Sequence, residues 1–274
     1  MIAGFRIVVS AVAYRLRNLE MFNMAAAVSI ACALRLSIFD IVMRTLFAFV
    51  LNALAYLNND YIDVQIDLQS ADKDNSKARF LAENLKAAFW AQIALLGILV
   101  AFAVLYDPGL FVAIVLGAGV CWWYSAQLKH RPFLDVLAMI VWGVGMPMPG
   151  VPLGNSVGIA MAIQLGLFSG VFETIQVLRD ADEDAKEGVR TTAVVLGKPR
   201  TKLLARILML SVTAYAALYM QPWAAAMTLI ALVIPFPDTD VERYWTRVKL
   251  VYGISWLMIC AWVFFYGQRA GLLG

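Results

Sequence analysis

Two clusters of acidic residues carry the clearest chemical signal in this sequence. In the first, Asn59, Asp63 and Asp67 recur at every fourth position, so a helix would place their side-chain oxygens on one face. Stacked carboxylates repel one another, and a bound cation would relieve that repulsion. Mg²⁺ favours such oxygen ligands and commonly shares them with substrate phosphates. The cluster therefore predicts a site for magnesium and phosphate, and a solvated acidic loop is the alternative.

The second cluster lies at 180–184 and repeats this arrangement. Asp180 and Asp184 would share a helical face, and Glu183 is a weaker candidate. Asp182, like Asp60 in the first cluster, would point away and is expected to matter less. Two such clusters could clamp a diphosphate and two magnesium ions between them. The predicted metal ligands are Asn59, Asp63, Asp67, Asp180 and Asp184, and the four aspartates among them are the predicted catalytic residues.

Basic residues accompany both clusters, and Lys and Arg neutralise phosphate charge. The alternative for each of them is an anchor at the cytoplasmic face of a membrane. Two polar residues inside an apolar run precede Asp180, and ionisable residues at such depth usually face a cavity. The predicted substrate-binding residues are Asn59, Lys77, Arg79, Tyr124, Lys129, Glu173, Gln176 and Arg190.

The elements that must position these residues are apolar helices. The chain is 62% hydrophobic and only 15% charged, against about 25% charged in a soluble domain. We therefore expect an all-α, polytopic membrane protein, a single domain over 1–274, with nine transmembrane helices around a central cavity. Residues 1–19 are expected to lie at the membrane surface. The predicted spans are 20–37, 39–57, 85–105, 108–125, 133–150, 157–178, 203–220, 222–236 and 249–267.

The distribution of Lys and Arg predicts the orientation. If the N-terminus is cytoplasmic, the N-terminal segment and the loops after spans two, four, six and eight hold all 22 basic residues except Arg35, Arg44 and Arg269. Both acidic clusters then lie on the cytoplasmic side, which would be that of the inner membrane in a bacterium. The net charge of +3 is small, and no nucleic-acid partner is expected.

The residues needed for other kinds of catalytic or metal site are scarce in this sequence. The sequence has one histidine, His130, and three cysteines without metal-ligand spacing, so a histidine-based metal site or a Ser-His-Asp triad is hard to build. A transporter or channel is a different class of alternative. It is disfavoured because transporters place their charged sites near the middle of the membrane rather than at one side.

The two clusters resemble the sequence motifs of the UbiA superfamily of intramembrane prenyltransferases. The segment 59–67 looks like the first family motif, and 180–192, followed by Leu196 and Gly197, looks like the second. The stretch Tyr124–Lys129 is similar to the Tyr and Lys element of the family. One departure follows the first motif, where Lys77-Ala78-Arg79-Phe80-Leu81 lacks the proline that the family often has after that motif.

The resemblance implies Mg²⁺ as cofactor, an allylic isoprenyl diphosphate as donor, and a lipophilic acceptor that reaches the site within the lipid bilayer. We expect first an aromatic acceptor, such as a hydroxybenzoate or a quinoline-like ring. A carotenoid end group, a glycerophosphate lipid or a porphyrin side chain is the second possibility, because 124–135 and 188–197 look somewhat like carotenoid-elongating members. Terpene cyclisation without an acceptor is the third.

Overall fold

The computed structural model describes residues 2–17, 21–69, 75–237 and 239–267, and these residues form helices and turns without a strand. The all-α prediction is confirmed. The helices are α1 (Ile2–Arg17), α2 (Phe22–Ala33), α3 (Ile38–Ile62), α4 (Val64–Gln69), α5 (Asn75–Glu83), α6 (Leu85–Leu105), α7 (Leu110–Ala113), α8 (Val120–Ala126), α9 (Leu134–Gly145), α10 (Ser156–Glu187), α11 (Thr192–Leu196), α12 (Lys198–Tyr215), α13 (Pro222–Val233) and α14 (Val241–Tyr266). Short π-helical segments, Ile114–Gly119 and Ala216–Met220, extend α7 and α12.

Five helical segments are long and apolar enough to cross a membrane: α3, α6, α10, α12 with its π-helical extension, and α14. Shorter apolar segments cover Phe22–Ala33, Leu110–Ala126, Leu134–Gly150 and Pro222–Val233, where the remaining spans were predicted. A straight crossing needs about 20 residues, which these four do not reach, so the count of nine crossings stays a prediction. The predicted break between the first two spans is confirmed, because α2 ends at Ala33 and α3 begins at Ile38.

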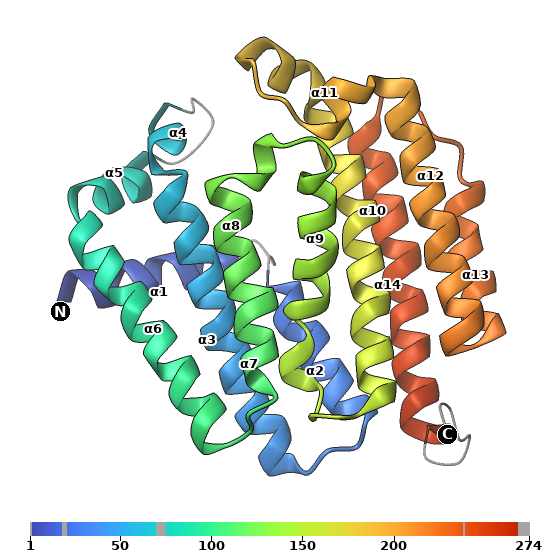
Figure 1. Cartoon of the computed structure of the whole chain (residues 1–274), viewed down its shortest axis with the longest axis horizontal. Helices are drawn as coiled ribbons and strands as arrows, with labels where there is room; N and C mark the ends of the chain where they lie inside the picture. The colour runs from blue at the N-terminus through green and yellow to red at the C-terminus, as the bar shows by residue number, and fades with distance from the viewer. Residues whose placement is uncertain (1, 18–20, 70–74, 238, 268–274) are drawn as a thin grey trace.

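The helix α10 is longer than the predicted span, which was expected to end at residue 178. It has 32 residues, so its length is about 48 Å, against about 30 Å for the hydrocarbon layer of a bilayer. The extra turns at its C-terminal end carry Asp180 and Asp184. In Figure 1 this end lies on the same side of the bundle as α4, α5 and α11, whereas the turns between α2 and α3 and between α9 and α10 lie at the opposite end.

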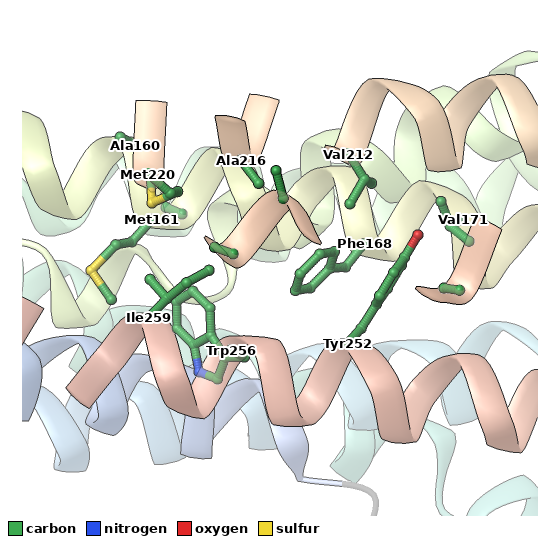
Figure 2. Packing of buried hydrophobic residues seen from close by; sticks show 14 of the residues in the cluster. Ala160, Met161, Phe168, Val171, Val212, Ala216, Met220, Tyr252, Trp256 and Ile259 are labelled. Carbon is green, nitrogen blue, oxygen red and sulfur yellow. The ribbon is translucent and has the colours of Figure 1, made fainter. Parts of the chain in front are cut away.

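The largest part of the core forms where α10 packs against α12 and α14. Phe168 of α10 stacks on Tyr252 of α14 with ring centroids 4.4 Å apart, and Figure 2 shows the two rings side by side. Val212 and Ala216, from α12 and its extension, are fully buried beside them. A second cluster, around Leu51, joins α3 to α6, α7 and α8. These apolar contacts hold the two motif-bearing helices, α3 and α10, in one bundle.

Small residues let α9 and α10 approach closely. A Cβ atom added at Gly166 would lie 2.7 Å from the backbone oxygen of Ile140 and 2.4 Å from a methyl carbon of Val144. Gly143 and Gly170 are equally crowded by the facing helix. Small residues at membrane helix interfaces permit this close van der Waals packing.

We predict that Gly166→Ala destabilises the protein by about 1–3 kcal/mol, because the added methyl group meets backbone of α9 that cannot move aside. Gly253→Ala in α14 is the matched control, since nothing lies within 4 Å of a Cβ atom there. Thermal unfolding in detergent should show a lower Tm for the first variant and an unchanged or higher Tm for the second. Equal Tm values would contradict the close approach of the two helices.

The buried Arg44 ties three segments together at the end of the bundle opposite the acidic motifs. Its guanidinium pairs with Asp107, which follows α6, and donates to the carbonyl oxygens of Pro149 and Val151 at 2.9 and 3.2 Å. The sequence placed this arginine inside a predicted span, where an unpaired charge would be costly. Its partners explain how the charge is tolerated there.

Candidate active site

The first acidic motif spans a bend in the chain. Helix α3 ends at Ile62, Asp63 caps it, and α4 begins at Val64. The Nδ2 of Asn59 donates to Asp63 Oδ2 at 2.9 Å, so these two predicted ligands are neighbours. The single continuous helix assumed for the motif is wrong at this point. Asp67 belongs to the first turn of α4, although its amide still bonds to the carbonyl of Asp63 at 2.9 Å.

The second motif lies on the last turns of α10. The helix ends at Glu187 and is capped by Gly188, whose left-handed φ of 74° suits glycine. The amide of Val189 bonds back to the carbonyl of Asp184 at 2.8 Å. This turn reverses the chain and brings Thr191 beside the helix, where its hydroxyl donates to Asp184 Oδ2 at 3.1 Å. The geometry therefore joins Asp184 to the segment that carries Arg190.

The other predicted ligand on α10, Asp180, pairs with its neighbour Arg179. The guanidinium makes two bonds to the carboxylate, at 2.7 and 3.0 Å, and a third to Glu242 of α14 at 2.8 Å. Asp182 points elsewhere, as predicted, and pairs with Lys198 at the surface. Asp180 is thus part of an ion-pair network at the exposed end of α10.

The end of α8 and the segment that follows it connect α3 to α10. Lys129 forms an ion pair with Asp63 of the first motif. The hydroxyl of Tyr124 donates to Glu173 on α10 at 2.8 Å, one and a half to two turns before Asp180. Three residues that sequence reasoning selected separately, Tyr124, Lys129 and Glu173, therefore act as links between α3 and α10. Ser125, which the sequence did not single out, accepts a bond from Asn59 at 3.3 Å.

His130 lies between the two motifs, a position that the sequence did not reveal. Burial and the adjacent Lys129 ammonium lower the pKa of His130, whereas the carboxylates of Asp63 and Asp184 act to raise it. One carboxylate of each motif therefore lies near enough to influence the same imidazole. A single histidine far from either motif in sequence offers no local spacing that could have indicated this.

Asp60 forms a separate, buried ion-pair cluster behind the first motif. Its side chain is only 6% exposed and pairs with Arg15 of α1 at 2.8 Å and with Lys77 of α5 at 2.6 Å. Lys77 was predicted to bind substrate, and in the structure its ion pair with Asp60 links α5 to the end of α3. Three helices therefore meet at one carboxylate.

The remaining predicted residues lie around this end of the molecule. Arg79 is exposed on α5, and Arg190 is exposed in the turn before α11. Gln176 is half-buried on α10, about one turn before Asp180. The structure thus places the predicted residues at the same end of the bundle, and side-chain contacts join Asn59 to Asp63, Lys129 to Asp63, and Tyr124 to Glu173.

The donor set fits magnesium by its chemistry. Asn59 and the four aspartates of the motifs supply hard oxygen ligands, which Mg²⁺ prefers, in combination with phosphate oxygens. Within the described residues no three acidic, histidine or cysteine side chains converge on one point. In proteins Mg²⁺ is commonly held by one or two carboxylates plus the phosphates of a substrate.

Comparison with known proteins identifies the family. The profile of the UbiA prenyltransferase family matches residues 21–238. The chain belongs to this family. It is therefore an integral membrane prenyltransferase, and the resemblance predicted from the two motifs is confirmed.

Two UbiA relatives and one solved structure show how far the likeness extends. A lycopene elongase/hydratase from Haloferax volcanii is 28% identical over 80% of this chain and 75% of its own length. A digeranylgeranylglyceryl phosphate synthase from Thermococcus gammatolerans is 26% identical over 54% of this chain and 53% of its own length. A UbiA homologue from Archaeoglobus fulgidus, solved with GPP and Mg²⁺, superposes with a TM-score of 0.66 at 17% identity, covering 94% of this chain and 99% of that one.

We predict that Asp60→Asn lowers stability by about 1–3 kcal/mol, because Arg15 and Lys77 would face a neutral amide in a largely buried site. Asp182→Asn is the matched control, since that carboxylate is 72% exposed and its ion pair with Lys198 is screened by water. Thermal unfolding of both variants in detergent measures the difference. A Tm for Asp60→Asn as high as that for Asp182→Asn would contradict a structural role for the cluster.

Proposed function

We propose that this UbiA-family protein binds an allylic isoprenyl diphosphate with Mg²⁺ at its acidic end and transfers the isoprenyl group to a lipophilic acceptor. The observation that carries this proposal is the bridge between the motif-bearing helices α3 and α10, in which Lys129 pairs with Asp63 and Tyr124 bonds to Glu173. The bridge gives one region both the carboxylates that suit a metal and the cation that suits a diphosphate.

Each residue of this region has a proposed role. Asn59, Asp63, Asp67, Asp180 and Asp184 would hold Mg²⁺, which when bound supplies charge neutralisation to the leaving diphosphate. Lys129, Arg190 and Arg79 would offset the rest of the phosphate charge. Lys77 supports the proposal less directly, because it already neutralises Asp60. Its contribution would be to hold α5, and so Arg79, near the first motif.

The reaction would proceed by cleavage of the C1–O bond of the donor. The electron pair of that bond leaves with the diphosphate, where the cationic side chains stabilise it. The allylic cation left behind is shielded from water by the apolar helices, which limits its hydrolysis. A carbon–carbon double bond of a polyene acceptor, or the hydroxyl oxygen of a glycerophosphate lipid, attacks C1. Loss of a proton from the adduct then completes the transfer.

The proposed acceptor is a carotenoid-like polyene or another isoprenoid lipid. This choice is supported by the relative matched over 80% of the chain, a lycopene elongase/hydratase, and by the second relative, a digeranylgeranylglyceryl phosphate synthase. An aromatic acceptor was the first expectation from the sequence, and neither relative is named for one. The aromatic ring therefore becomes the second candidate, to be decided by experiment.

The proposed topology has nine crossings, with the N-terminus and the acidic end in the cytoplasm, and a single domain with an interfacial segment at 1–19. It is supported by the long and shorter apolar helices, which follow one another along the chain. It is also supported by the positions of the Lys and Arg residues, which gather at the acidic end. The central cavity belongs to the same proposal, since the acceptor must reach the donor between the helices.

We predict that Asp63→Ala and Asp180→Ala each reduce prenyl transfer by about 100-fold or more, because each removes charge that holds the metal–diphosphate unit. Asp182→Ala, at an exposed position outside the proposed site, should retain activity within about threefold. Release of labelled diphosphate by purified protein, with Mg²⁺ and with EDTA, provides the measurement. Full activity in Asp63→Ala or Asp180→Ala, or activity unaffected by EDTA, would refute the metal assignment.

A second prediction concerns the acceptor. Protein in lipid vesicles, given Mg²⁺ and a labelled allylic diphosphate, should form a prenylated product with lycopene or an isoprenoid glycerophosphate and not with 4-hydroxybenzoate. Mass spectrometry of the extracted lipids identifies the product. A product formed only with 4-hydroxybenzoate would favour the aromatic acceptor, and a cyclic hydrocarbon formed without any acceptor would favour cyclisation.

A further inference from the structure

A fully buried carboxylate stands next to the proposed site and takes no part in the roles described above. Asp135, in the first turn of α9, is 0% exposed. It accepts hydrogen bonds from the amide of Thr192 at 2.7 Å, from the hydroxyl of Thr192, and from the amide of Val136 at 2.8 Å. In the described part of the chain no Lys or Arg pairs with it. A buried carboxylate without a counterion depends on such hydrogen bonds, so the contact with Thr192 is energetically important.

The same threonine also holds a strained residue. Phe133, just before α9, has a left-handed φ of 67°, which is unfavourable for a bulky side chain. Its amide donates to the hydroxyl oxygen of Thr192 at 2.6 Å. Thr192 therefore receives one bond from the chain before α9 and gives two to Asp135. This reciprocal contact joins the start of α9 to the start of α11, across 57 residues of sequence.

The residues next to Thr192 belong to the proposed diphosphate site. Thr191 bonds to Asp184 at 3.1 Å, and Arg190 is the residue before it. Asp135 fixes Thr192 at the α11 end of the turn 188–192. The other end of the turn is fixed at the C-terminus of α10 by the bond from Val189 to Asp184. The position of the Arg190 backbone follows from these two anchors.

We propose that Asp135 and Thr192 form a positioning pair that holds the turn 188–192 in place, so that Arg190 and Thr191 face the diphosphate bound near Asp184. This inference rests on the proposed function of that site. Neither member of the pair touches the substrate. The pair acts through Arg190 and Thr191, and its loss weakens diphosphate binding more than it slows the chemical step.

The kinetic test uses Thr192→Val, which keeps the shape of the side chain and removes its hydroxyl. We expect the KM for the allylic diphosphate to rise about tenfold, with kcat changed less than threefold. Asp135→Asn should behave in the same way, because its amide cannot accept both bonds from Thr192. Thr192→Ser, which restores the hydroxyl, should stay within about threefold of wild type. An unchanged KM in Thr192→Val would overturn the proposal.

A double-mutant cycle with Arg190→Ala then separates positioning from general stability. If the pair acts through Arg190, adding Thr192→Val to Arg190→Ala should raise the KM less than twofold further. A second full tenfold rise would overturn the proposal. The matched control is Thr228→Val in α13, which removes another fully buried threonine hydroxyl, one that bonds to Thr213 at 3.1 Å. It should lower the Tm without changing the KM.

Hydrogen exchange of the amides in 188–192 tests the pair without reference to catalysis. We expect exchange at least fivefold faster in Thr192→Val and Asp135→Asn, and unchanged exchange in Thr192→Ser and Thr228→Val. Unchanged exchange in Thr192→Val would overturn the positioning pair even in an active enzyme. A different outcome is faster exchange in Thr192→Val together with a wild-type protein that releases no diphosphate from any allylic substrate. That outcome would overturn the proposed function and with it the catalytic role of the pair.

Discussion

The free-energy cost of ionised groups in apolar surroundings governs the arrangement of this protein. In the part of the chain that the structure describes, each buried charged side chain has a hydrogen-bonding or ion-pair partner. Arg44 pairs with Asp107 at one end, and Asp60 pairs with Arg15 and Lys77 at the other. The additional turns of α10 avoid the cost of burying charge, because they carry the second motif beyond the apolar part of the helix. The carboxylates buried at the acidic end are satisfied by ion pairs, as at Asp60, or by hydrogen bonds alone, as at Asp135.

The parts of the site that could be predicted from the sequence are those with a local signature. The neighbours Asn59 and Asp63 share a helical turn, and the carboxylates of α10 follow a helical period, so spacing alone identified them. The bend at Asp63 could not be predicted in this way, because the backbone hydrogen bonds continue across it and no glycine or proline marks it.

Contacts between distant segments explain what the sequence did not reveal. The bond between Asp135 and Thr192 joins residues 57 positions apart, and the pair of Lys129 with Asp63 joins residues 66 apart. Lys77 looked like a phosphate ligand because it follows the first motif, and only the folded chain shows that Asp60 lies beside it. Local patterns thus located the acidic end of the fold, while the partners within it depended on how the helices pack.

The donor and the acceptor differ in how strongly a sequence can specify them. A diphosphate is recognised by charges, which are few in this chain and easily located. A hydrocarbon acceptor is recognised by the shape of an apolar surface, and such surfaces distinguish similar molecules by only about 1–3 kcal/mol per methylene group. The abundance of apolar side chains in every helix therefore leaves the acceptor to be decided by relatives and by experiment.

The hydrogen bonds of Arg44 have a consequence for the routes that charged molecules can take through the protein. They fasten α3 to the chain after α6 and to the turn before α10, at the end away from both motifs (Figure 1). These bonds give Arg44 and Asp107 partners within the protein at that end. Diphosphate released at the acidic end would return to the aqueous phase from which the donor came. Charged molecules would then enter and leave the protein at one membrane face only, and turnover would not dissipate the ion gradients of the membrane.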